Sequence, residues 1–88
     1  MPTYVVERYV PRSTSGNLCS EGEKVAQAAR DLTGANSESV TYLSSVYIPD
    51  DEISFCLFDG GSTETIAACF EQAQVAFDRI LEAEVLRP

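Results

Sequence analysis

Four short runs of β-branched and aromatic residues alternate along the chain with two segments whose apolar residues recur every three or four positions. Such runs favour strands, and a period of three to four residues favours an amphipathic helix. The predicted strands cover residues 3–9, 39–48, 52–58 and 79–86. The order is therefore strand, helix, strand, strand, helix, strand, and the short Pro-Asp-Asp link at 49–51 predicts that the two middle strands form an antiparallel hairpin.

Both predicted helices have recognisable ends. Ser20 and Glu23 have the spacing of a capping box, and Gly34 suits the C-terminal stop of the first helix. Ser62 is the expected N-cap of the second helix. The apolar stripes consist of Val25, Ala28, Ala29 and Leu32 in the first helix and of Ile66, Cys69, Phe70 and Ala73 in the second. Each helix thus has one face that can pack against a sheet.

This order of elements is that of the ferredoxin-like βαββαβ arrangement, an α+β fold. Right-handed crossovers predict an antiparallel four-stranded sheet with the spatial order 4-1-3-2, numbered along the chain, and two helices on one face. The 88 residues suffice for a single domain, residues 1–88, with a thin core.

Alternation along each strand predicts which face of the sheet each side chain occupies. Val6 and Arg8 are expected under the helices, because the long stem of Arg8 can carry its charge to the rim, and Glu7 is expected on the opposite, open face. The other predicted core residues of the last two strands are Ile53, Phe55, Leu57, Leu81, Ala83 and Val85. The open face then receives Val5, Tyr9, Tyr42, Ser44, Ser54, Cys56, Phe58, Ile80, Glu82, Glu84 and Leu86.

An open face with this composition is too apolar to be covered by water alone. A second copy facing it across a two-fold axis would bury the apolar residues and form a dimeric α+β barrel. A homodimer through the sheet face is therefore expected, with polar residues lining a pocket between the paired sheets. The predicted ligand-binding residues of that pocket are Tyr9, Tyr42, Ser44, Cys56 and Phe58.

Composition excludes several classes of function. The formal net charge of −8 argues against nucleic acid and against an anionic membrane surface as partners, and no apolar run approaches the roughly 18 residues of a membrane span. Cys19, Cys56 and Cys69 have the spacing of neither a disulfide framework nor a zinc site, which favours a reducing cytoplasm. The chain has no histidine, so Ser-His-Asp and Cys-His catalysis are impossible.

Four stretches carry a further signal when they are taken together: YVVER at 4–8, YLSSVYIPDDEISFCLF at 42–58, STETI at 62–66 and FDRI at 77–80. They resemble a family of small proteins described as nickel-responsive. The resemblance implies the ferredoxin-like fold and the pairing of two copies through their sheets. Nickel binding in that family is associated with histidine side chains, and because this sequence has none, the resemblance carries over no metal ligand.

Glu7 is the candidate catalytic residue, because a carboxylate in a largely apolar cavity can serve as a general base. The alternative is a cavity-lining carboxylate bonded to a tyrosine or to water. Cys56 is either a reactive thiol or, as is usual for a buried cysteine, a small apolar group. Glu7, Glu82 and Glu84 offer oxygen ligands for a hard cation, although acidic residues on an edge strand more often protect it from aggregation.

Three functions fit this sequence, and no particular cofactor is indicated. The first is a small dimeric protein that binds a small organic molecule or a metal ion between its paired sheets. The second is a cofactor-free α+β-barrel enzyme, an isomerase, cyclase or oxygenase, in which Glu7 is the base and Tyr42 or Arg8 polarises a carbonyl group. The third is an interaction module whose sheet face binds another protein and encloses no pocket.

Overall fold

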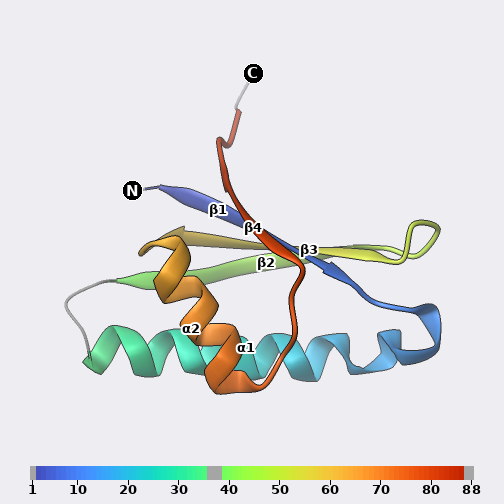
Figure 1. Ribbon diagram of the computed structural model, residues 1–88, viewed down its shortest axis with the longest axis horizontal. Helices are drawn as coiled ribbons and strands as arrows, with labels where there is room; N and C mark the ends of the chain where they lie inside the picture. Colours follow the sequence, from blue (N-terminus) through green and yellow to red (C-terminus); the bar gives the residue numbers. More distant parts are fainter. Residues whose placement is uncertain (1, 36–38, 87–88) are drawn as a thin grey trace.

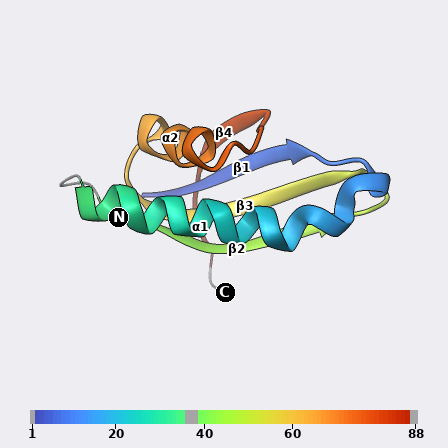
Figure 2. The same ribbon diagram turned by 90° about the horizontal axis from the view of Figure 1, so that it is seen from below.

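The computed structural model describes residues 2–35 and 39–86. It has two layers, a sheet and a pair of helices that lie on the same side of it (Figure 1). Along the chain the elements are β1 (Thr3–Tyr9), the 3-10 helix η1 (Arg12–Asn17), α1 (Leu18–Ala35), β2 (Val40–Ile48), β3 (Ile53–Gly60), α2 (Thr63–Ala73) and β4 (Arg79–Ala83). Viewed from the helix side, α1 runs along β2 and β3, and α2 lies towards β1 and β4 (Figure 2).

The sheet is antiparallel throughout, and its strand order is β2-β3-β1-β4. This is the predicted order 4-1-3-2 counted from the other edge, so the ferredoxin-like prediction is confirmed. The central position of β1 places Glu7 and Arg8 in the middle of the sheet. Among the described residues, neither helix has the length and apolar character needed to cross a membrane.

The helix ends differ in part from the prediction. The chain enters α1 through η1, so α1 begins at Leu18, and Ser20 donates a hydrogen bond back to the Asn17 carbonyl at 3.0 Å. The predicted capping box at Ser20 is therefore wrong, and α1 continues through Gly34 to Ala35. The predicted cap of α2 is confirmed, since the Ser62 hydroxyl accepts a hydrogen bond from the Thr65 amide at 3.2 Å.

The face assignment of β1 is confirmed. Val6 and Arg8 are buried on the helix side, and Tyr9 is exposed on the open face. Glu7 also faces away from the helices, where its carboxylate accepts a hydrogen bond from the Arg79 side chain of β4.

The face assignment of β3 is wrong. Directly paired residues of neighbouring strands lie on the same face, and Val6 pairs with Cys56 while Arg8 pairs with Ser54. The helix-facing residues of β3 are therefore Ser54, Cys56 and Phe58, all buried, and those predicted as core, Ile53, Phe55 and Leu57, lie on the open face. Both alternating sets contain large apolar residues, so alternation alone could not distinguish them.

The same inversion holds for β4. Val6 pairs with Ile80, which packs against the core, and Val5 pairs with Leu81, which is 40% exposed on the open face. Ala83 is on the open face and Glu82 on the helix side, again the reverse of the prediction. The strand ends at Ala83, so Glu84, Val85 and Leu86 follow it, on the side away from the helices (Figures 1 and 2).

A β-bulge at Leu43 changes the alternation within β2. Tyr42 pairs with Phe58 on the helix side, whereas Ser44 pairs with Leu57 on the open face. The prediction that both residues share the open face is thus wrong for Tyr42, whose ring packs edge-on against Phe58 with centroids 5.3 Å apart. A bulge places two residues opposite one partner, so the face pattern shifts by one position beyond it.

Candidate ligand cavity

A cavity of about 520 Å³ lies between α1 and the helix-facing side of β2 and β3. This volume falls within the range of pockets that hold small organic molecules, about 300–1,000 Å³. The lining residues are Arg8, Ser15, Leu18, Cys19, Gly22, Glu23, Val25, Ala26, Tyr42, Ser45, Tyr47, Ser54, Cys56 and Phe70. The cavity therefore lies within one subunit, on the face opposite the one where the sequence predicted a pocket.

Small residues on α1 leave this space open. Ala26 has only a methyl group, and a Cβ atom at Gly22 would lie 3.2 Å from the Tyr42 hydroxyl oxygen. The absent side chain thus allows the Tyr42 ring to reach across from β2 to the helix. On the sheet side, Ser45, Ser54 and Cys56 are also small, so helix and sheet are held apart by the larger side chains around them.

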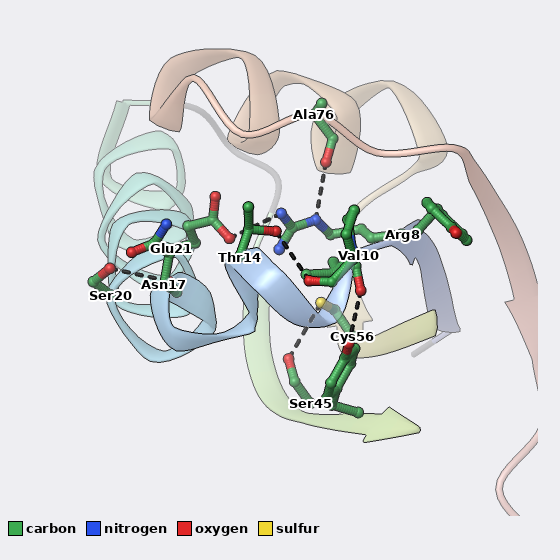
Figure 3. A network of polar contacts seen from close by, with 12 residues as sticks. Arg8, Val10, Thr14, Asn17, Ser20, Glu21, Ser45, Cys56 and Ala76 are labelled. Atoms are coloured by element: carbon green, nitrogen blue, oxygen red, sulfur yellow. Dashed lines mark hydrogen bonds and ion pairs between the residues drawn. The ribbon is translucent and has the colours of Figure 1, made fainter. Parts of the chain in front are cut away.

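Arg8 is the buried charge of the cavity, with a residue exposure of 8%. Its Nε donates a hydrogen bond to the Ala76 carbonyl at 2.9 Å, and its Nη2 donates one to a Glu21 carboxylate oxygen at 3.0 Å. Figure 3 shows the guanidinium between these two partners, one on α1 and one in the segment after α2. A guanidinium has five N–H groups, and these bonds use two of them.

The remaining polar groups of the cavity wall are mainly hydroxyls and thiols. Ser45 donates a hydrogen bond to the Cys56 sulfur at 3.2 Å (Figure 3) and is also hydrogen-bonded to Tyr42. Tyr47 donates to the Val10 carbonyl at 2.7 Å. Burial raises the pKa of the Tyr42 phenol above its ordinary value, so this group is neutral and protonated at physiological pH.

A cluster of contacts at the β2–β3 turn anchors the chain that leads into η1. The Glu52 carboxylate accepts hydrogen bonds from the Arg12 amide at 2.8 Å and from the Tyr9 hydroxyl at 3.0 Å. Arg12 also donates to the Pro49 carbonyl at 2.9 Å and forms an ion pair with Asp50. Because η1 contributes Ser15 to the cavity wall, this anchor helps to define one end of the cavity.

Acid is expected to weaken this anchor. The hydrogen bond from the Arg12 amide, followed by that from Tyr9, lowers the pKa of Glu52 below its ordinary value of 4.5. A depressed carboxyl pKa stabilises the fold fully above the ordinary value, and the stabilisation is lost as the pH falls through the folded-state pKa. Glu52→Gln should therefore lower the urea midpoint of unfolding at neutral pH. In acid, the midpoints of the variant and of the unmodified protein should become equal.

Asp51→Asn is the matched control, since it removes the same charge from the same turn. Its urea midpoint should equal that of the unmodified protein at each pH from neutral to about pH 3. Equal pH dependence in the Glu52→Gln and Asp51→Asn variants would contradict a specific role for Glu52.

The structure brings only part of the predicted site together. Tyr42 and Cys56 line the cavity, whereas Phe58 is fully buried in the core. Tyr9 and Ser44 lie on the open face, as predicted, and therefore on the other side of the sheet from the cavity. The binding roles given to these five residues stay predictions.

Sequence reasoning missed Ser54 and Gly22 as cavity residues, and it named Arg8 only as a residue that could polarise a carbonyl group in the alternative enzyme. The sequence predicts Arg8 under the helices, where it lies, but it also predicts that the charge reaches the rim, whereas the Arg8 side chain is buried. Two features of the sequence could have identified these residues. A charge in a central strand needs a buried partner, and a glycine within a helix often marks the close approach of another group. Gly22 is such a glycine, because the Tyr42 hydroxyl approaches it closely.

The open face of the sheet carries a continuous set of apolar side chains. Val46 is 53% exposed, and it lies opposite Phe55, which in turn pairs with Glu7. The apolar residues of this open face are Val5, Val46, Ile48, Ile53, Phe55, Leu57, Leu81 and Ala83. Beyond β4, Val85 and Leu86 are two further exposed apolar residues.

Comparison with known proteins identifies relatives of this chain. Residues 4–83 match the model of a family described as nickel responsive protein SCO4226-like. The fold is similar to the crystal structure of SCO4226 from Streptomyces coelicolor A3(2), with a TM-score of 0.78 and 20% sequence identity over 97% of this chain and 99% of that one. None of the curated proteins matches the chain.

Proposed function

The chain belongs to the SCO4226-like family of nickel responsive proteins, and from this premise we propose that it is a homodimer whose subunits each bind a small organic molecule beneath α1. The cavity of about 520 Å³ carries the proposal. Val25, Ala26 and Phe70 give it an apolar wall, and Arg8, Ser45 and Tyr42 bring a few polar groups to it. This combination is typical of pockets that bind organic ligands.

The composition of the open face supports the second part of the proposal, a second copy as its partner. Two sheets that pack face to face bury the apolar residues of both, and a two-fold axis makes one patch complementary to itself. Glu7 and Arg79, which lie side by side within this patch, form an ion pair, so their charges balance. Placement of the dimer in the cytoplasm stays a prediction.

The metal in the family description does not fit this chain. The sequence has no histidine, and within residues 2–35 and 39–86 no three side chains of the Cys, Asp and Glu types gather in a way that could hold a metal ion. Nickel is bound in proteins chiefly by imidazole, thiolate and similar donors. Nickel is therefore not part of the proposed function.

The general-base role of Glu7 receives no support from its surroundings. Its carboxylate is paired with Arg79 on the open face, and the cavity is on the other side of the sheet. A base must come within hydrogen-bond reach of the proton that it removes. Ligand binding is therefore the function that the geometry favours over catalysis by Glu7.

Native mass spectrometry of protein purified from its own host tests both parts of the proposal. The expected species is a dimer that retains a small organic molecule in each subunit. Ala26→Leu should lose that molecule while remaining dimeric, because a leucine there would extend into the cavity. Gln27→Leu is the matched control, since Gln27 is exposed on the same helix.

The results separate the two parts. A monomer that retains the molecule would overturn the dimer but not the ligand site. A dimer that retains no small molecule, with or without the Ala26→Leu substitution, would overturn the ligand site but not the dimer.

A further inference from the structure

We propose that the ligand of this cavity is an uncharged, largely apolar molecule with a carbonyl oxygen, and that Arg8 is the residue that selects it. The inference rests on the proposed function and adds the chemical class of the ligand. Three observations carry it: the free donors of Arg8, the neutralisation of its charge, and the uncharged character of most other polar groups in the wall.

The Arg8 side chain is buried, and hydrogen bonds to two separate segments hold it in place. Its bonds to Ala76 and Glu21 fix the guanidinium plane in the cavity wall (Figure 3). Among the described residues these bonds use two of the five N–H groups of the guanidinium, and the others can donate to an acceptor on a ligand. A ligand oxygen that accepts a hydrogen bond is therefore the complementary group.

The charge of Arg8 is already balanced by Glu21, at 3.0 Å. Glu23, a second acidic residue, is among the residues that line the cavity. An incoming anion would thus meet one cation and two anions, within a chain whose net charge is −8. Transfer of an anion from water to such a site is unfavourable, whereas a neutral carbonyl loses far less hydration.

The remaining wall fits the rest of such a molecule. Val25, Ala26 and Phe70 offer apolar contacts to a ring or chain. Ser45 and Tyr42, whose hydroxyl groups are hydrogen-bonded to each other and to Cys56, add no charge to the wall. A cavity of this volume admits a molecule of one or two rings.

The test uses three probes with the same aromatic body: acetophenone, which has the carbonyl; ethylbenzene, which lacks it; and benzoate, which is an anion. Each is titrated into ¹⁵N-labelled protein, with the amide signals of Gly22 and Ala26 reporting on the cavity and those of Val46 and Leu81 on the open face. Acetophenone is expected to shift the cavity signals and to bind about tenfold more tightly than either other probe.

A pair of double variants assigns the selectivity to Arg8. Arg8→Met with Glu21→Gln removes both charges of the buried pair together, so that neither is left unpaired, and it should abolish the preference for acetophenone over ethylbenzene. Arg79→Met with Glu7→Gln removes the Arg–Glu pair of the open face and should leave the preference unchanged.

Each other result overturns the inference in a recognisable way. Tighter binding of benzoate would identify an anion site, and equal binding of ethylbenzene would identify an apolar cavity without selection; in both cases the proposed ligand-binding function survives. If none of the probes shifts the signals of Gly22 and Ala26, the inference and the ligand site of the proposed function both fail.

Discussion

Phe58→Ala is expected to destabilise the protein by about 3–5 kcal/mol, the range for removal of a fully buried aromatic ring. The Phe58 side chain is 0% exposed. Its ring packs edge-on against Tyr42, at 5.3 Å between centroids, and against Phe70, at 5.8 Å. Because these contacts join β2, β3 and α2, the loss affects both layers, and it is measured as the change in the free energy of unfolding in urea.

The matched control is Phe55→Ala, three positions earlier in the same strand. Phe55 is only partly buried in the isolated subunit and faces the open side, so its loss should cost about 1 kcal/mol once the subunits are separated by dilution. If Phe58→Ala does not fold, Phe58→Leu should fold with a loss of about 1 kcal/mol. A larger loss for Phe55→Ala than for Phe58→Ala in the separated subunits would mean that the two faces of β3 have been exchanged.

The topology could be predicted from the sequence because it depends on features that are local and redundant. Ser62 and the stripe around Ile66 and Phe70 identify α2, and the Pro-Asp-Asp turn can join only an antiparallel pair. Errors of one or two residues, such as the start of α1 at Leu18 instead of near Ser20, leave the order of elements unchanged. The order and the handedness of crossovers then fix the sheet.

The faces of the sheet could be predicted only for β1, where a charge marks each side. Between Ile53 and Phe58 of β3, both alternating sets are apolar apart from Ser54, so this part of the strand does not identify the covered side. The pairing register decides it, because Ser54 pairs with the buried Arg8 and therefore lies on the same face. The bulge at Leu43 likewise depends on pairing with β3 and leaves no clear mark in the sequence.

The cavity could not be predicted, since its walls come from separate elements whose contacts are non-local. Arg8, Glu21 and Ala76 are brought together by the fold, and Gly22 becomes meaningful only when Tyr42 reaches it from β2. The apolar open face, by contrast, was expected, although several of its residues were not those predicted. The reason is that β3 and β4 carry large apolar residues in both alternating sets, so an inverted assignment still produces an apolar open face.

Leu57→Glu is expected to convert the proposed dimer into a monomer, weakening the association by at least roughly a thousandfold. Leu57 lies near the middle of the open face, with Val5 on one neighbouring strand and Ser44 on the other. In a two-fold assembly each substitution occurs twice, so two carboxylates would be buried without partners. Sedimentation velocity at about 10 μM measures the change, since an unmodified dimer of ordinary affinity is associated at that concentration.

Two further variants test whether the loss of the dimer could come from added negative charge alone or from a change of side-chain shape at position 57. Ser13→Glu adds the same charge on exposed η1 and should remain dimeric, and Leu57→Met keeps the apolar contact and should do the same. Because the cavity is on the other side of the sheet, the Leu57→Glu monomer should still bind acetophenone, as judged by the Gly22 and Ala26 signals. A Leu57→Glu protein that stays dimeric would show that the subunits associate through a different surface, and the open face would then need another partner to cover its apolar residues.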